Sequence, residues 1–113
     1  MVTRDQMLFL EDILEAIERI EEYTGDMDFK SFAGDKKTFD AVIRNLEVMG
    51  EAAKNISEGF KNENPEIKWR GIAGMRDKLI HGYFGVDPEI VWETIQKRLP
   101  ELKDQLNKKW NEL

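Results

Sequence analysis

Residues 4–23 read RDQMLFLEDILEAIERIEEY, and this stretch decides the fold class. Its apolar residues recur every three or four positions, which is the period of an amphipathic α-helix. Acidic residues fill most of the positions between them. We therefore predict a helix over residues 4–23 with one side facing a core. The apolar positions are Leu8, Leu10, Ile13, Leu14, Ile17 and Ile20.

The first helix is expected to end at Gly25, a residue type suited to a left-handed C-terminal cap. The connection that follows is expected to hold one short helical turn around Phe29 and Phe32. Asp35 is the predicted N-cap of a second long helix, which runs to about Phe60. The predicted buried residues of that helix are Phe39, Val42, Ile43, Leu46, Met49, Ala53 and Ile56.

A polar loop over residues 61–65 is predicted to separate this helix from a third one. The third helix begins at about Pro65 or Lys68 and ends at His81. Its predicted apolar residues are Trp69, Ile72, Ala73, Leu79 and Ile80. Gly71 and Gly74 within it are expected to permit the close approach of another helix, at some cost in helix propensity.

The last helix is predicted to begin at Asp87-Pro88, which reads as an N-cap followed by a first-turn proline. Pro100 either kinks or splits it, because proline lacks the donor that an interior helical position needs. Its predicted apolar residues are Trp92, Ile95, Leu99, Leu102, Leu106 and Trp110. The sequence thus predicts one all-α domain over residues 1–113, a four- to five-helix up-and-down bundle.

The bulk composition limits what kind of protein this is. The 113 residues include no cysteine, which excludes a disulfide framework and thiolate metal sites and suits a reducing cytoplasm. The apolar group near the N-terminus, Met7 to Leu10, is too short for a signal peptide or a membrane span. We expect a cytoplasmic protein with no membrane or DNA partner.

The net charge of −6 is unevenly spread. Residues 1–60 carry 14 acidic and 7 basic side chains, whereas residues 61–83 carry 3 acidic and 5 basic ones. Residues 84–113 carry 6 and 5. The protein as a whole should therefore repel nucleic acid. A focused phosphate site within the basic stretch stays compatible with this distribution.

The residues best suited to chemistry lie together in residues 76–83, which read RDKLIHGY. His81 is the only histidine of the chain, so it cannot build a multi-histidine metal site alone. We expect neither a metal nor another cofactor. Arg76 precedes His81 by five positions and Tyr83 follows it by two, across the expected helix-ending glycine, Gly82.

Side chains five residues apart on a continuous helix differ by about 140° in direction. Arg76 and His81 therefore do not stack on one face. Their functional groups meet if Arg76 reaches around the helix, if Gly82 lets the helix open at His81, or if two copies of the chain pool their residues. The second and third arrangements are both compatible with the sequence.

The pair Arg76 and His81 suggests cleavage of RNA by its own 2′-hydroxyl. Histidine titrates close to neutrality and can act as general acid or base, and helix-end carbonyls favour its protonated form. The planar guanidinium of Arg76 can bind a phosphate and stabilise charge on the phosphorane. Tyr83 could be exposed to a modifying enzyme, and an AMP attached there would fill the phosphate site. The alternative interpretation of Tyr83 is that its ring packs on the bundle and its hydroxyl lies in water.

The pattern Arg76-x4-His81-x-Tyr83 matches the signature of the HepT-like toxins, a branch of the HEPN superfamily. The resemblance covers nearly the whole chain. Three further segments, with sequences VMGEA, WRGIAGMRD and VDPEIVW, resemble the family's Gly-Glu-Ala segment, its tryptophan-to-arginine run and the start of its last helix. They span residues 48–52, 69–77 and 86–92.

This resemblance implies an all-α homodimer that is the toxin of a type VII toxin–antitoxin pair. The implied partner is a small MntA-like minimal nucleotidyltransferase. By position, Arg76 and His81 would be the ribonuclease residues, and Tyr83 the tyrosine that the partner adenylylates. The family often has asparagine after the arginine, where this chain has Asp77; that acid could orient Arg76 or His81, yet it would also repel RNA. The alternative function is a non-catalytic helical module that binds a nucleotide or docks on a nucleotidyltransferase.

Overall fold

The computed structural model describes the backbone of residues 3–81 and 86–113, and the side chains of residues 3–75 and 86–113. Within these ranges all regular secondary structure is helical, which confirms the predicted all-α class. The elements are α1 (Arg4–Thr24), α2 (Phe29–Gly34), α3 (Lys36–Asn55), α4 (Glu58–Glu63), α5 (Trp69–His81), α6 (Pro88–Glu93), the π-helical turn η2 (Thr94–Arg98) and α7 (Leu99–Glu112).

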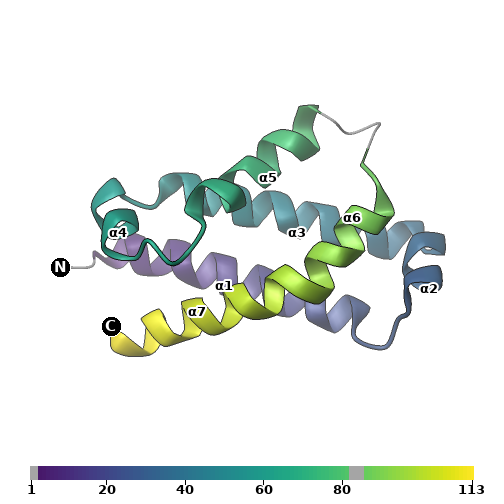
Figure 1. Ribbon diagram of the computed structural model, residues 1–113, viewed down its shortest axis with the longest axis horizontal. Coiled ribbons are helices and arrows are strands. Elements are labelled where there is room, and N and C mark those ends of the chain that lie inside the picture. The colour runs from purple at the N-terminus through teal and green to yellow at the C-terminus, as the bar shows by residue number, and fades with distance from the viewer. Residues whose placement is uncertain (1–2, 82–85) are drawn as a thin grey trace.

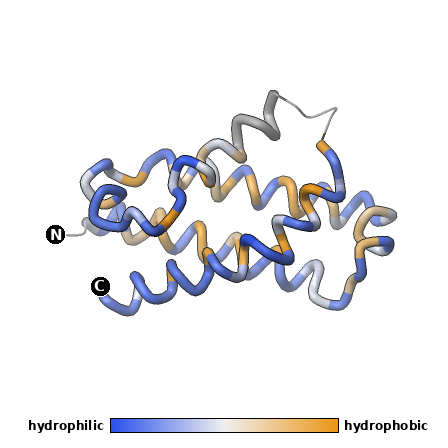
Figure 2. Tube along the Cα trace, viewed as in Figure 1, coloured by the Kyte–Doolittle hydropathy of each residue, from blue (hydrophilic) through white to orange (hydrophobic). Residues whose placement is uncertain are grey.

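Four rods form an up-and-down bundle, as predicted (Figure 1). Helices α1 and α3 lie side by side, α5 packs on α3, and the rod made of α6, η2 and α7 returns along α1. The apolar residues of the rods turn inward (Figure 2). The largest fully buried side chains are Phe32, Leu10, Ile13, Ile17, Ile20, Met49, Ile67, Leu99, Leu106 and Val42.

The predicted helix starts are confirmed by their capping hydrogen bonds. The Asp35 carboxylate accepts a bond from the backbone N–H of Thr38 at 3.1 Å. The Asp87 carboxylate accepts one from the N–H of Glu89 at 2.9 Å, with Pro88 in the first turn. A short side chain that accepts from the first turn satisfies donors with no intrahelical partner. The short helix α2 also lies where the sequence predicts it.

The predicted continuation of the second long helix to Phe60 is wrong. Helix α3 ends at Asn55, and Ile56 has extended backbone angles (φ −74°, ψ 136°). Ser57 then begins α4, because its hydroxyl accepts a hydrogen bond from the N–H of Phe60 at 3.2 Å. The N–H of Ser57 donates to the side-chain oxygen of Gln6 in α1 at 2.7 Å, so a distant part of the chain helps to fix the break. The predicted polar loop accordingly begins later, because α4 extends to Glu63.

Two predictions for the first helix are also wrong. Gly25 has right-handed backbone angles (φ −55°, ψ −36°) rather than a left-handed cap. A side chain is disfavoured there for a different reason, since a Cβ atom would lie 3.0 Å from the carbonyl oxygen of Glu21. Leu8 is 45% exposed, whereas the other five predicted core residues of this helix are buried.

Pro100 is accommodated without a break in the last rod. The turn before it is π-helical, and the N–H of Leu99 donates to the carbonyl of Thr94, five residues back. Such a widened turn commonly absorbs an irregularity in an α-helix. The rod therefore continues from α6 into α7 (Figure 1), and Ile95, Leu99, Leu102 and Leu106 reach the core along it as predicted.

Candidate functional site

The start of the site-bearing helix α5 is fixed by a buried tryptophan. Trp69 is 6% exposed, and its indole N–H donates to the backbone carbonyl of Asn64 at 3.0 Å. The Asn64 side chain in turn donates to the carbonyl of Phe60 at 2.9 Å. The rings of Phe60 and Trp69 meet edge to face at 5.9 Å between centroids. This network ties the first turn of α5 to α4, and it confirms that Trp69 belongs to the core.

The structure places Arg76, Asp77 and His81 on one continuous helix, since α5 remains helical through His81. Their side chains lie outside the described part of the chain, and Tyr83 lies outside it altogether. By helical period, position 76 follows the buried Trp69 and Ile72 by seven and four residues. Positions 77 and 81 follow a different line, that of Arg70 and Gly74. The backbone thus keeps the 140° separation predicted for Arg76 and His81.

The chain is fixed again just beyond the site segment, at α6. The ring of Trp92 lies 5.2 Å from that of Phe32 and 6.4 Å from that of Phe29, and Phe32 also packs on Phe39 at 5.6 Å. These aromatic contacts join α6 to α2 and to the start of α3. The segment that carries the proposed chemistry therefore runs between two anchored tryptophans.

The end of α5 rises away from α3, whereas its start lies close to the bundle (Figure 1). Gly71 and Gly74 face outward as well. A Cβ atom built on Gly74 would meet no described atom within 4 Å, and one on Gly71 would meet only the Cβ of Lys68 at 3.8 Å. The expected close approach of another helix at these glycines is therefore absent from the described part of this chain.

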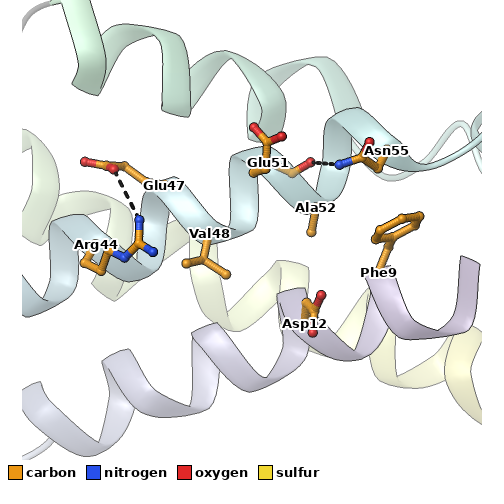
Figure 3. Close-up of a pocket in the computed structure, with 8 residues that line it drawn as sticks. All are labelled: Phe9, Asp12, Arg44, Glu47, Val48, Glu51, Ala52 and Asn55. Carbon is orange, nitrogen blue, oxygen red and sulfur yellow. Dashed lines mark hydrogen bonds and ion pairs between the residues drawn. The ribbon is translucent and has the colours of Figure 1, made fainter. Parts of the chain in front are cut away.

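A second feature of the surface is a hollow of about 350 Å³, which lies between α1 and α3 (Figure 3). Phe9, Val48 and Ala52 supply its apolar wall, and the acids at its edge include Asp12. The nearby Arg44 guanidinium lies 3.9 Å from the carboxylate of Glu47. Its charged edge is thus mainly acidic, which opposes phosphate binding there. The lining residues are Phe9, Asp12, Arg44, Glu47, Val48, Glu51, Ala52 and Asn55.

The loop that leads into α5 is joined to α7 by an ion pair. The ammonium of Lys109 lies 3.1 Å from the carboxylate of Glu66. The pKa of Glu66 is lowered by a hydrogen bond from its own backbone N–H and by its bond with Lys109. The pKa of Lys109 is raised chiefly by the same side-chain bond. Glu66 therefore stays ionised, and Lys109, which also lies 3.6 Å from the Glu112 carboxylate, offsets only part of its charge.

Within the described residues, no group of three or more histidine, cysteine or acidic side chains is arranged to hold a metal ion. No helix in that part of the chain combines the length and apolar character needed to cross a membrane.

The sequence analysis missed two features of this surface. The hollow between α1 and α3 depends on which helix faces stay uncovered, and periodicity alone does not specify this. The outward position of Arg70 was predictable in principle, because Arg70, Gly74, Asp77 and His81 recur at helical spacing. Lys68 precedes the helix and is not on that line.

Comparison with known proteins gives a consistent result. Residues 13–108 match the family described as "Ribonuclease HepT-like". A protein of Thermococcus cleftensis named "Probable ribonuclease HepT" is 56% identical over 100 residues, which cover 88% of this chain and 91% of that protein. A Methanocaldococcus jannaschii protein with a provisional RNase name is 50% identical over 100 residues, covering 88% of this chain and 83% of its own length. No solved structure matched the chain.

Proposed function

The chain belongs to the HepT-like ribonuclease family, and from that premise we propose that it is a cytoplasmic endoribonuclease whose site is Arg76 and His81. The observation that carries the proposal is that both residues lie on the outward-rising end of α5, in a chain whose relatives have ribonuclease names. Along the chain, this end lies between two helix starts whose tryptophans make hydrogen-bond or ring contacts with other helices.

The proposed reaction needs one proton acceptor, one proton donor and a cation. The 2′-hydroxyl of the RNA loses its proton and its oxygen bonds to the adjacent phosphorus. The bond from phosphorus to the 5′-oxygen breaks, and that oxygen takes up a proton. The products are a 2′,3′-cyclic phosphate and a free 5′-hydroxyl. We assign one proton transfer to His81, the other to solvent water, and the stabilisation of the phosphorane to Arg76.

We further propose that a homodimer completes the site. Arg76 and His81 diverge on the helix, and the end of α5 stands clear of α3 (Figure 1). A second copy could bring its own α5 to the same place, so that arginine from one chain serves histidine from the other. A cyclic two-fold pair is the commonest assembly of identical chains.

The regulation that we propose acts through Tyr83. A nucleotidyltransferase of the MntA-like kind would join the tyrosine oxygen to the α-phosphate of ATP, with release of pyrophosphate and of the phenolic proton. The added phosphate would compete for Arg76 and His81. The chain would then be the toxin of a type VII toxin–antitoxin pair.

The test is RNA cleavage by the pure protein in the presence of a chelator. Wild type should cleave, whereas Arg76→Ala and His81→Ala should not; Arg19→Ala, which removes an exposed charge on α1, is the matched control. If wild type and both site variants cleave equally little, the enzyme proposal fails. The non-catalytic docking module, which the acid at Asp77 favours, then takes its place.

Mixing the two inactive variants tests the shared site. After random exchange of chains, about half of the dimers contain one chain of each variant. If arginine and histidine of a site come from different chains, each mixed dimer has one intact site of its two. Activity should then recover to about a quarter of wild type. Absence of recovery, with exchange verified, contradicts sharing. For the modification, Tyr83→Phe should take up no AMP from the partner enzyme and ATP; equal labelling would refute the assignment.

A further inference from the structure

The outward face of α5 begins with two exposed cations. Lys68 and Arg70 are both exposed, and neither has an ion-pair partner among the described residues. The start of the lysine side chain lies beside Gly71, since its Cβ is 3.8 Å from the place where a Gly71 side chain would begin. Trp69 and Ile72, by contrast, are buried in the core. The positive charges thus belong to the surface of this helix.

This face leads directly to the candidate site. Arg70, Gly74, Asp77 and His81 follow one another by four, three and four residues on one continuous helix. At 100° per residue their positions fall within about 60° of each other. The 1.5 Å rise per residue puts position 70 about 16 Å along the axis from position 81.

The middle of the face leaves room for a ligand close to the helix. Gly74 has no described atom within 4 Å of its absent side chain, and Gly71 has only the lysine stem. A strand of nucleotides could therefore lie near the backbone between the two ends. The acidic hollow between α1 and α3 offers no comparable surface.

We infer that Lys68 and Arg70 form a phosphate-binding subsite, which holds the backbone of a single-stranded RNA on the outer face of α5 and directs it toward His81. This inference rests on the proposed function. It explains how a chain with a net charge of −6 can hold a polyanion. Arg70 lies on the line of His81, and Lys68 lies just before α5 on the other side of Gly71. The two cations therefore flank the outward face, and neither has an ion-pair partner among the described residues. Each would contact one phosphate.

The experiment measures binding of a fluorescent RNA whose 2′-hydroxyls are methylated, so that it cannot be cleaved by its own hydroxyl. Anisotropy gives the affinity of wild type and of Lys68→Ala/Arg70→Ala across a range of salt. The matched control is Arg19→Ala/Lys97→Ala, which also removes one arginine and one lysine, both exposed and already paired on other helices. Thermal unfolding verifies that all three proteins are folded.

Two phosphate contacts should contribute about 1.4 to the slope of log affinity against log salt, since each contributes about 0.7 for a single strand. Between about 50 and 200 mM salt, wild type should therefore lose about sevenfold more affinity than the Lys68/Arg70 variant. The control should keep the wild-type slope. Cleavage of a long RNA by the Lys68/Arg70 variant should show a raised KM with an almost unchanged kcat.

Several results would overturn the subsite while leaving the ribonuclease proposal intact. One is that the Lys68/Arg70 variant keeps the wild-type slope of log affinity against log salt, while wild type still cleaves RNA. Another is that the control variant loses as much of the salt slope as the Lys68/Arg70 variant, which would mean that the total charge of the protein, and not the position of the two cations, sets the affinity. A third is wild type that cleaves RNA but loses binding of an acidic peptide, and not of RNA, when Lys68 and Arg70 are replaced, which would make the face a protein-docking surface instead. Failure of the ribonuclease itself is recognised separately, by absent cleavage in wild type.

Discussion

Replacing Trp69 by phenylalanine should destabilise the protein by about 2–3 kcal/mol. The substitution removes the indole N–H that donates to Asn64 at 3.0 Å. That carbonyl still accepts a bond from the N–H of Ile67 at 3.3 Å, so the lost bond should cost only about 1 kcal/mol. The smaller ring leaves unfilled space in a buried position, which adds about 1–2 kcal/mol. For a domain of this size the midpoint of thermal unfolding should fall by about 8–12 °C.

Urea unfolding followed by far-UV circular dichroism measures the free energy of unfolding. The matched control is Trp110→Phe, because Trp110 is only partly buried on α7 and its indole makes no hydrogen bond with any described residue. The control should lose less than about 1 kcal/mol. Equal losses in the two variants would refute the reasoning, since they would show that ring size alone, and not the tie between α4 and α5, sets the cost.

Three further changes test other parts of the structure. Ile17→Ala should lower the free energy of unfolding, measured in urea, by about 2–5 kcal/mol, because Ile17 is fully buried. Leu8→Ala should change it by no more than about 0.5 kcal/mol, because Leu8 is 45% exposed. Similar losses in the two variants would contradict the observed buried face of α1. The pKa of Asp35 is lowered chiefly by the hydrogen bond from the Thr38 backbone N–H, so its contribution to stability is complete above the unfolded pKa and is lost as pH falls through the folded one. Asp35→Asn, which still caps the helix but does not titrate, should therefore lose less stability than wild type between about pH 5 and pH 2.5, and parallel curves would exclude this source of acid sensitivity. Asp77→Asn should strengthen RNA binding because it removes an acid from the line of Arg70 and His81; weaker binding, measured by anisotropy, would instead give Asp77 an orienting role.

The helices were predictable because their signals are local. Apolar spacing identified all four rods, and capping residues such as Asp35 and Asp87 marked two of their starts. The break at Ser57 was missed, although a serine followed by an acid is itself an N-cap signal. The apolar spacing of the flanking helices outweighed it. The Gln6 oxygen that accepts a hydrogen bond from the Ser57 N–H, and so supports the break, lies in a distant part of the chain.

Burial was less predictable than helix position. Leu8 was counted among the core residues, yet at 100° per residue it lies about 180° around α1 from the fully buried Ile17 and therefore faces away from the core. The two outward glycines of α5 illustrate the same limit, since the sequence predicts the close approach of another helix and no described helix supplies it. For the candidate site, the order of Arg76 and His81 on one helix was predictable, and the α5 backbone agrees with it. How the side chains of Arg76 and His81 meet depends on contacts with other helices or with a second copy of the chain. For that reason the sequence left several arrangements of the two residues open.

The arrangement of anchors gives the proposed regulation a physical basis. Trp69 and Trp92 attach the chain to α4 and α2 on either side of the site segment, and the described buried core consists of residues outside that segment. We expect a group added at Tyr83, which lies between these anchors in the sequence, to leave the core of α1, α3 and α7 in place. Control through an added charge can then act on substrate binding alone. A protein inactivated in this way would keep its fold and could be reactivated by removal of the group, which a mechanism based on unfolding the site helix would not allow so readily.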